Sequence, residues 1–125
     1  MAELQKLDKS TDAKTIKEIM DQDGACILQD VLSNAEVDQL MSELMPFVDR
    51  TPYGADAFTG TLTRRTGALA ARSAACRELI IHPNIVDSAN EFLLRFSKKI
   101  QVHLTQTIYI DPGQGAQVLH RDRYA

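Results

Sequence analysis

The chain has 125 residues, of which 44% are hydrophobic and 25% charged, and its formal net charge is −3. These values are typical of a folded globular domain, so they exclude wholesale disorder and favour one domain. The chain has no basic stripe, no apolar run near the roughly 20 residues that cross a bilayer, and no signal-peptide core at residues 1–6, so we expect a cytoplasmic protein that binds neither nucleic acid nor membrane.

The first elements are predicted from local capping and apolar patterns. Residues 1–12 are polar, and we expect them to be loose. Asp12 is a candidate N-cap for a helix over residues 13–22, which Gly24 is expected to end. The short apolar run at residues 25–28 predicts a strand.

A capping box formed by Ser33 and Glu36 begins the clearest helix of the chain. The apolar residues of this helix recur at spacings of three and four, at Val37, Leu40, Met41, Leu44 and Phe47. Residues 51–61 are rich in Gly, Pro, Thr and Asp, which predicts a long loop and a candidate lid. The weak alternation over residues 61–66 indicates a strand.

Two further helices are predicted before the chain changes its period. Residues 73–82 and 84–96 have the apolar content of helices, and Pro83 suits the first turn of the second one. His82, at the junction, is expected to have a structural or capping role. This part of the chain completes a predicted helical layer.

The last part of the chain is predicted to form strands. Residues 99–110 alternate between apolar and polar side chains, which indicates one long strand. A turn at residues 111–113 leads to a second predicted strand over residues 116–120. Helices first and strands last favour an α+β fold, in which a helical layer packs against one face of a mostly antiparallel sheet.

His120 and Asp122 are the residues most suited to chemistry. In an extended segment, residues two apart project from the same face, so these two side chains present an imidazole nitrogen and a carboxylate oxygen to one point. Such a pair is half of a 2-His-1-carboxylate triad, which leaves three positions of Fe(II) open. An H-x-D triplet is also common by chance, and a surface His–Asp pair is the alternative.

The residues around this triplet resemble the first metal motif of the phytanoyl-CoA dioxygenase family, in which a strand and a P-G turn precede Q-x-L-H-x-D. Residues 111–122 carry this pattern as Asp-Pro-Gly-Gln-Gly-Ala-Gln-Val-Leu-His-Arg-Asp. Further similar landmarks are Asp23-Gly24, Val31-Leu32-Ser33, Arg72-Ser73 and His82-Pro83. The resemblance extends over about residues 22–125.

The resemblance implies an Fe(II)- and 2-oxoglutarate-dependent oxygenase that acts on a small-molecule or acyl-CoA substrate. The implied fold is a double-stranded β-helix, a jelly-roll or cupin-like barrel with helices packed outside. His120 and Asp122 are the implied iron ligands, together with a distal His. Gln117 resembles a position that hydrogen-bonds the keto-acid, and one of Arg64 and Arg65 resembles a basic position near it. An exposed or solvated strand position is the alternative for all three.

The sequence has no His after His120 and no suitably spaced Arg after Asp122. We therefore expect a truncated, partial domain with low activity by itself and unpaired strand edges. Its expected parts are a loose N-terminus (residues 1–12), a mainly helical layer (13–97), and the first core strands with the metal motif (98–125).

Two other functions are compatible with the sequence alone. One is a non-catalytic fragment or interaction module that has lost the site. The other is a hydrolase in which His120 is the base and Asp122 orients it, although no Ser or Cys has the context of a nucleophile. The sequence predicts no particular oligomeric state.

Overall fold

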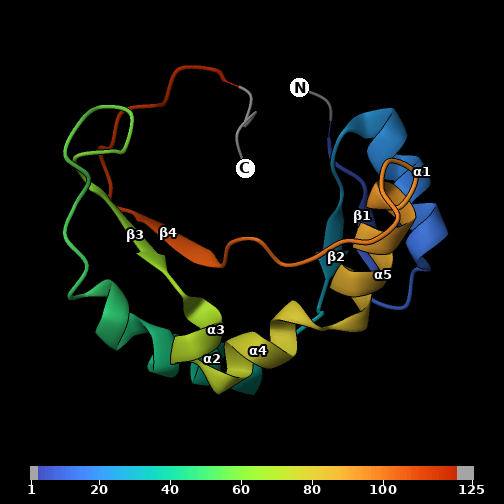
Figure 1. The fold of residues 1–125 in the computed structure, drawn as a ribbon, viewed down its shortest axis with the longest axis horizontal. Helices are drawn as coiled ribbons and strands as arrows, with labels where there is room; N and C mark the ends of the chain where they lie inside the picture. Colours follow the sequence, from blue (N-terminus) through green and yellow to red (C-terminus); the bar gives the residue numbers. More distant parts are fainter. Residues whose placement is uncertain (1–2, 121–125) are drawn as a thin grey trace. The chain divides into compact units, whose positions relative to one another are not determined.

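A computed structural model describes residues 3–120 as a mixture of helices and short strands (Figure 1). In chain order the elements are β1 (Lys6–Asp8), α1 (Ala13–Asp23), β2 (Ile27–Gln29), α2 (Asn34–Val48), β3 (Thr63–Gly67), α3 (Leu69–Arg72), α4 (Ala74–Ile80), α5 (Pro83–Leu93) and β4 (Gln106–Ile110). They belong to two compact units. The first unit combines the residues up to 38 with residues 77–101, and the second combines residues 39–76 with those from 102 onward.

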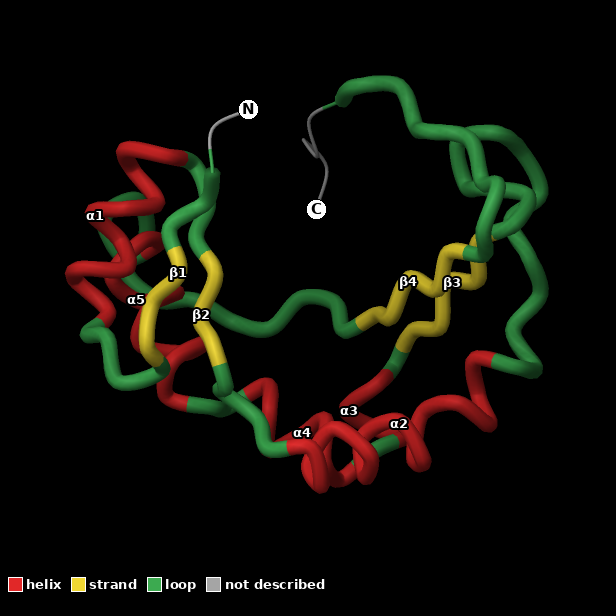
Figure 2. Tube along the Cα trace, turned by 180° about the vertical axis from the view of Figure 1, so that it is seen from behind, coloured by secondary structure: helices red, strands yellow, loops and turns green. Residues whose placement is uncertain are grey.

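The first unit contains a parallel pair of strands and two packed helices. Strands β1 and β2, one of the two yellow pairs in Figure 2, place Leu7 opposite Leu28. Helix α1 packs against α5 and buries Ile16. The expected loose N-terminus is therefore wrong for residues 6–8, because they hydrogen-bond to a strand about 20 positions away that local polarity does not reveal.

The predicted caps of α1 and α2 are confirmed. The Asp12 carboxylate accepts a hydrogen bond of 3.0 Å from the Thr15 amide, and Gly24 ends α1 with a φ of 80°. At the start of α2, the Ser33 amide donates to Glu36 (2.7 Å) and the Glu36 amide donates to the Ser33 hydroxyl (3.3 Å). These bonds satisfy amides that a helix leaves unpaired at its first turn.

The predicted start of α5 is confirmed as well. Pro83 occupies the first turn, and the His82 ring accepts a hydrogen bond of 3.3 Å from the Asn84 amide. His82 thus has the capping role that its place before a proline indicated. None of the helices within residues 3–120 has both the length and the apolar character needed to cross a membrane.

The second unit is built on the antiparallel pair β3–β4, in which Thr63 lies opposite Ile110 and Arg65 opposite Ile108. Its buried apolar residues are Leu44, Val48, Leu69 and Cys76. Thr66 is also buried, and its hydroxyl lies 2.8 Å from the Thr51 hydroxyl. This hydroxyl pair joins β3 to the residues that directly follow α2.

Glu43 connects α2 to the start of α4. Its carboxylate accepts hydrogen bonds from the Ser73 hydroxyl (2.6 Å) and from the Ala75 amide (3.1 Å). These bonds hold the pKa of the Glu43 carboxyl at about 2, and the bond from the Ser73 hydroxyl has the largest effect. A carboxylate at the first turn of a helix also stabilises the positive end of the helix dipole.

Two predictions about strands are wrong. The long strand expected over residues 99–110 is only Gln106–Ile110, because its partner β3 has five residues and ends at Gly67. The strand expected over residues 116–120 is absent, and no ladder partner lies beside that segment within the part of the chain described. Alternation makes a segment suited to a strand, but a neighbouring backbone is needed to form one.

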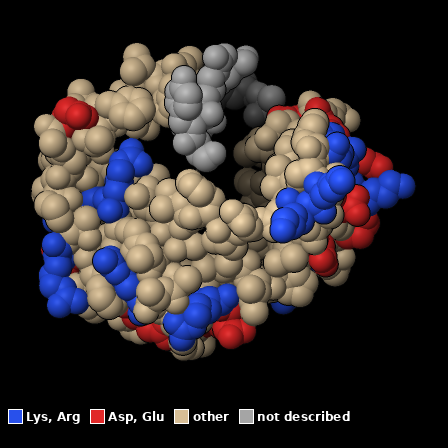
Figure 3. Space-filling view, in the orientation of Figure 1, with Lys and Arg blue, Asp and Glu red and all other residues tan. Residues whose placement is uncertain are grey.

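The expected α+β class is confirmed to the extent that the chain mixes helices with short strands. The expected single sheet is not found in the described residues. The described residues form two separate two-stranded sheets, one in each unit. The face drawn in Figure 3 has a broad uncharged area, and both basic and acidic side chains lie around it.

Candidate active site

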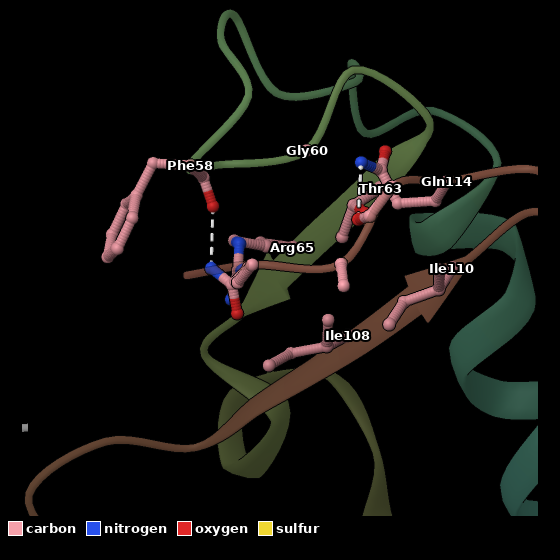
Figure 4. Close-up of a pocket in the computed structure, with 10 residues that line it drawn as sticks. Phe58, Gly60, Thr63, Arg65, Ile108, Ile110 and Gln114 are labelled. Atoms are coloured by element: carbon pink, nitrogen blue, oxygen red, sulfur yellow. Dashed lines mark hydrogen bonds between the residues drawn. The ribbon is translucent and has the colours of Figure 1, made fainter. Parts of the chain in front are cut away.

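A hollow of about 270 Å³ lies in the second unit, over one face of β3–β4 (Figure 4). Strands, the loop of residues 51–62 and the segment of residues 114–117 all contribute to its wall. Its apolar lining comes from Phe58, Ile108 and Ile110, and its polar lining from Thr63, Arg65, Gln114 and Gln117. An apolar pocket with a few convergent polar groups is the usual form of a small-molecule site.

The structure separates the two candidate arginines. Successive residues of a strand point to opposite faces, so Arg65 lines the hollow and Arg64 points away from it. Arg65 donates from Nε to the Thr59 carbonyl oxygen at 3.2 Å. Arg65 and Gln117 therefore belong to the same pocket, and Arg64 does not line it.

Arg64 takes part in a different cluster. Its guanidinium donates to the Tyr53 hydroxyl at 2.8 Å, lies 4.2 Å from the centre of that ring, and is 4.0 Å from the Asp111 carboxylate. The Tyr53 hydroxyl donates to Asp111, and this hydrogen bond raises the pKa of the tyrosine. The three side chains connect the start of the loop to β3 and to the end of β4.

The segment that leads to His120 is held by the loop rather than by a strand. The Gln114 side-chain oxygen accepts a hydrogen bond of 2.7 Å from the Leu62 amide. The Gln117 side chain donates to the Phe58 carbonyl oxygen at 2.6 Å, one of the dashed bonds in Figure 4. The His120 ring lies 5.2 Å from the Phe58 ring, at an interplanar angle of 57°.

The ring of His120 is oriented by its own backbone too. Its Nδ1 lies 2.8 Å from the Val118 carbonyl oxygen. A carbonyl only accepts, so a neutral His120 has its proton on Nδ1 and a lone pair on Nε2. Histidines that bind metals usually donate from the other ring nitrogen in this way.

Asp122, the predicted second ligand, lies outside the described residues. Within residues 3–120, no group of three or more His, Cys, Asp and Glu side chains is arranged to hold a metal ion. The geometry thus gives the surroundings of His120, and the pairing of His120 with Asp122 stays a prediction.

The loop beside the hollow is tightly folded. The Gly54 amide donates to the Thr63 carbonyl oxygen at 3.0 Å, and the Gly60 amide donates to the Asp56 carbonyl oxygen at 2.8 Å. Gly60 has a φ of +88°, and a Cβ there would lie 2.3 Å from the Thr63 hydroxyl oxygen. Only glycine fits this position without displacing its neighbours.

The sequence model of the phytanoyl-CoA dioxygenase family matches residues 20–125. The chain belongs to this family. The resemblance predicted from the residues around His120 is therefore confirmed, with nearly the same extent as the predicted range of 22–125.

Curated members of this oxygenase family are similar to the chain over almost all of its length. Dioxygenase FUM3 of Gibberella moniliformis is 28% identical over 94% of the chain. Dioxygenase ALT11 of Alternaria alternata is 30% identical over 95% of it, and Dioxygenase cdmA of Talaromyces verruculosus is 28% identical over 95%. The chain spans 44%, 43% and 43% of these relatives.

Two contacts of this phytanoyl-CoA dioxygenase family member were not predicted. Gln114 received no role, although a Gln directly after a Pro-Gly turn is well placed to hydrogen-bond a neighbouring loop. Phe58 was covered only by the prediction that residues 51–61 form a candidate lid, whereas the structure brings it against His120 and Gln117. The sequence offers no signal for this contact, because residues 58 and 120 are far apart along the chain.

Proposed function

We propose that this chain supplies one iron ligand pair and part of the 2-oxoglutarate pocket of an Fe(II)- and 2-oxoglutarate-dependent oxygenase. The observation that carries the proposal is the His120 ring, which is bonded through Nδ1 to a backbone carbonyl beside a hollow that contains Arg65 and Gln117. Membership of the phytanoyl-CoA dioxygenase family supports the same chemistry.

The donor groups fit a ferrous ion. His120 would offer the Nε2 lone pair, and Asp122, two positions later in the sequence, would add a carboxylate oxygen. A distal histidine, beyond those of this chain, would complete the facial triad. Iron bound with 2-oxoglutarate and dioxygen supplies the oxidation of the substrate.

The chain's own residues would bind and orient the keto-acid. The Arg65 guanidinium is a planar donor suited to a carboxylate, and the Gln117 amide can donate a further hydrogen bond. Ile108 and Ile110 would contact the methylene groups and exclude water. Arg64 is less suited to this role, because Tyr53 and Asp111 already hold it outside the hollow.

We further propose that the whole protein forms a double-stranded β-helix, to which β3, β4 and residues 114–120 contribute. Apolar side chains on these segments are strongly exposed: Ile110 by 61%, Val118 by 76% and Leu119 by 104%. Such exposure is unusual for a finished fold and favours burial by further strands. The same exposure favours the second candidate function, a non-catalytic interaction module.

The substrate of the proposed oxygenase would be a small molecule or an acyl-CoA.

The test is an anaerobic titration of Fe(II) and 2-oxoglutarate, followed by the visible charge-transfer band of the complex. It compares this chain with a form extended to the length of its relatives. We expect the band in the extended form and its loss in H120A and D122A. R65A should weaken 2-oxoglutarate binding by roughly 10-fold or more, as expected for a lost charge-assisted pair.

R64A is the matched control, since it removes the same charge one residue away. It should leave the keto-acid affinity within about twofold of the wild-type value. An extended protein that gives no band would refute the oxygenase proposal and favour the interaction module. Equal losses in R64A and R65A would refute the assignment of Arg65 alone.

A further inference from the structure

Phe58 contacts both the first residue of the H-x-D motif and the segment before it. Its ring lies against the His120 ring, and its backbone carbonyl accepts the hydrogen bond from Gln117. We propose that Phe58 is a positioning residue that fixes the orientation of the His120 imidazole. This inference rests on the proposed function, in which His120 binds the metal.

The ring contact has an attractive geometry. Aromatic rings prefer tilted or offset arrangements with centres roughly 4.5–7 Å apart. The Phe58 and His120 rings lie 5.2 Å apart with an interplanar angle of 57°. The contact therefore restricts the plane of the imidazole, while the bond from Nδ1 to the Val118 carbonyl selects its tautomer. Together, the ring contact and the hydrogen bond fix the direction in which the Nε2 lone pair points.

Apart from the Val118 carbonyl, which bonds Nδ1, no sheet supports the described segment that carries His120. Residues 114–120 have no strand partner among the described residues. Val118 and Leu119, the two residues before His120, are 76% and 104% exposed. Phe58 is contacted both by the His120 ring and by the Gln117 side chain, so it acts on this segment at two positions.

Phe58 itself is held by a rigid turn. The Asp56 carboxylate accepts hydrogen bonds from the Thr59 amide (2.7 Å) and from the Thr59 hydroxyl (2.8 Å). The Gly60 amide closes the turn onto the Asp56 carbonyl oxygen at 2.8 Å. These bonds tie Asp56 to Thr59 and Gly60, on either side of Phe58, so its ring and carbonyl project from a hydrogen-bonded turn.

The two contacts can be separated by mutation, since one uses the side chain and the other the backbone. F58A removes the ring but keeps the carbonyl that binds Gln117. F58L keeps apolar bulk without a π system, and F58Y keeps the ring. Q117A removes the backbone contact and leaves the ring contact in place.

The experiment is NMR of the histidine side chains in the full 125-residue chain, with His82 and His103 as internal controls. In the wild-type protein and in F58Y, we expect ring-current-shifted His120 protons and nitrogen shifts of the Nδ1–H tautomer. In F58A and F58L, the His120 protons should move to unshifted values and the tautomer preference should weaken. The signals of His82 and His103 should not change.

A titration with Mn(II) alone adds a readout of metal affinity, through paramagnetic broadening of the His120 signals. F58A should raise the Mn(II) concentration at half broadening by roughly 10-fold, the lower range for lost partners of a metal ligand. F58Y should restore the wild-type value. Amide-exchange protection at Thr66 verifies that the β3–β4 pair remains folded in each variant.

The outcomes separate this inference from the proposed function. Unchanged His120 shifts and tautomer in F58A, with Thr66 still protected, would overturn the positioning role. Loss of Thr66 protection in F58A would also overturn it, by showing that the ring acts on the fold instead. Absence of Mn(II) broadening in an extended wild-type protein would instead contradict the metal site, whatever the ring shifts show.

Discussion

The glycines around the hollow allow the geometry of the loop to be tested with three single substitutions. Gly60 combines a φ of +88° with a neighbour only 2.3 Å from the position of an added Cβ. Gly113 has a φ of +90° but its nearest neighbour is 4.0 Å away, and Gly115 has neither constraint. Replacing each by alanine therefore separates backbone strain from steric overlap.

The expected costs follow from these differences. An L-residue held in the left-handed region costs about 1–2 kcal/mol, so G113A should lower the free energy of unfolding by that amount. G60A carries the same strain, and in addition Thr63 and Gln114 must move away from the new methyl group. Overpacking of this kind adds about 1–3 kcal/mol. G60A should therefore cost about 2–5 kcal/mol in total.

G115A is the control and should be neutral or stabilising by up to about 1 kcal/mol, because alanine restricts the unfolded chain. The assay is urea unfolding followed by tyrosine fluorescence, since the chain has three tyrosines and no tryptophan. The expected order of stability is G115A, then G113A, then G60A. A G60A protein as stable as G115A would refute the tight packing of the loop against Thr63.

Two further predictions concern the helices of the second unit. Above pH 4.5 the Glu43 carboxylate stabilises the fold, because its pKa is lowered from 4.5 to about 2; this contribution is lost as the pH falls from 4.5 towards 2. E43Q should lose less stability than the wild-type protein between pH 5 and pH 2.5 in urea unfolding, and equal losses would contradict the assigned hydrogen bonds. V48A should cost about 2 kcal/mol, because Val48 is only 2% exposed. V118A, at a 76% exposed site, should change the unfolding midpoint little, and similar costs for the two variants would place the core elsewhere.

The helices were predictable from the sequence because their signals are local. The side chain of Asp12 and the pair of Ser33 and Glu36 each bond an amide three residues away, so a short window contains both partners. The strands were less predictable, since β1 and β2 are separated by the whole of α1. The length of β4 is set by β3, about 40 residues earlier, and not by its own alternating pattern.

The candidate site divides in the same way. The spacing of His120 and Asp122 and the Pro-Gly turn before them are sequence features, and they were sufficient to indicate the family. The choice between Arg64 and Arg65 required the register of β3 against β4, because only the register assigns each side chain to a face. The contact of Phe58 with His120 required the tertiary structure.

The two units are interleaved along the chain: the segment of residues 39–76 lies between the two segments of the first unit. During synthesis, all residues of the first unit are available only after position 101 has left the ribosome. Similarly, β3 can pair with β4 only after residue 110 has been made. No single cut of the chain would release either unit intact. Cleavage at one site should therefore leave at least one unit with a segment on either side of the cut or with one segment broken, and expressing a unit by itself would require joining distant segments with a new linker.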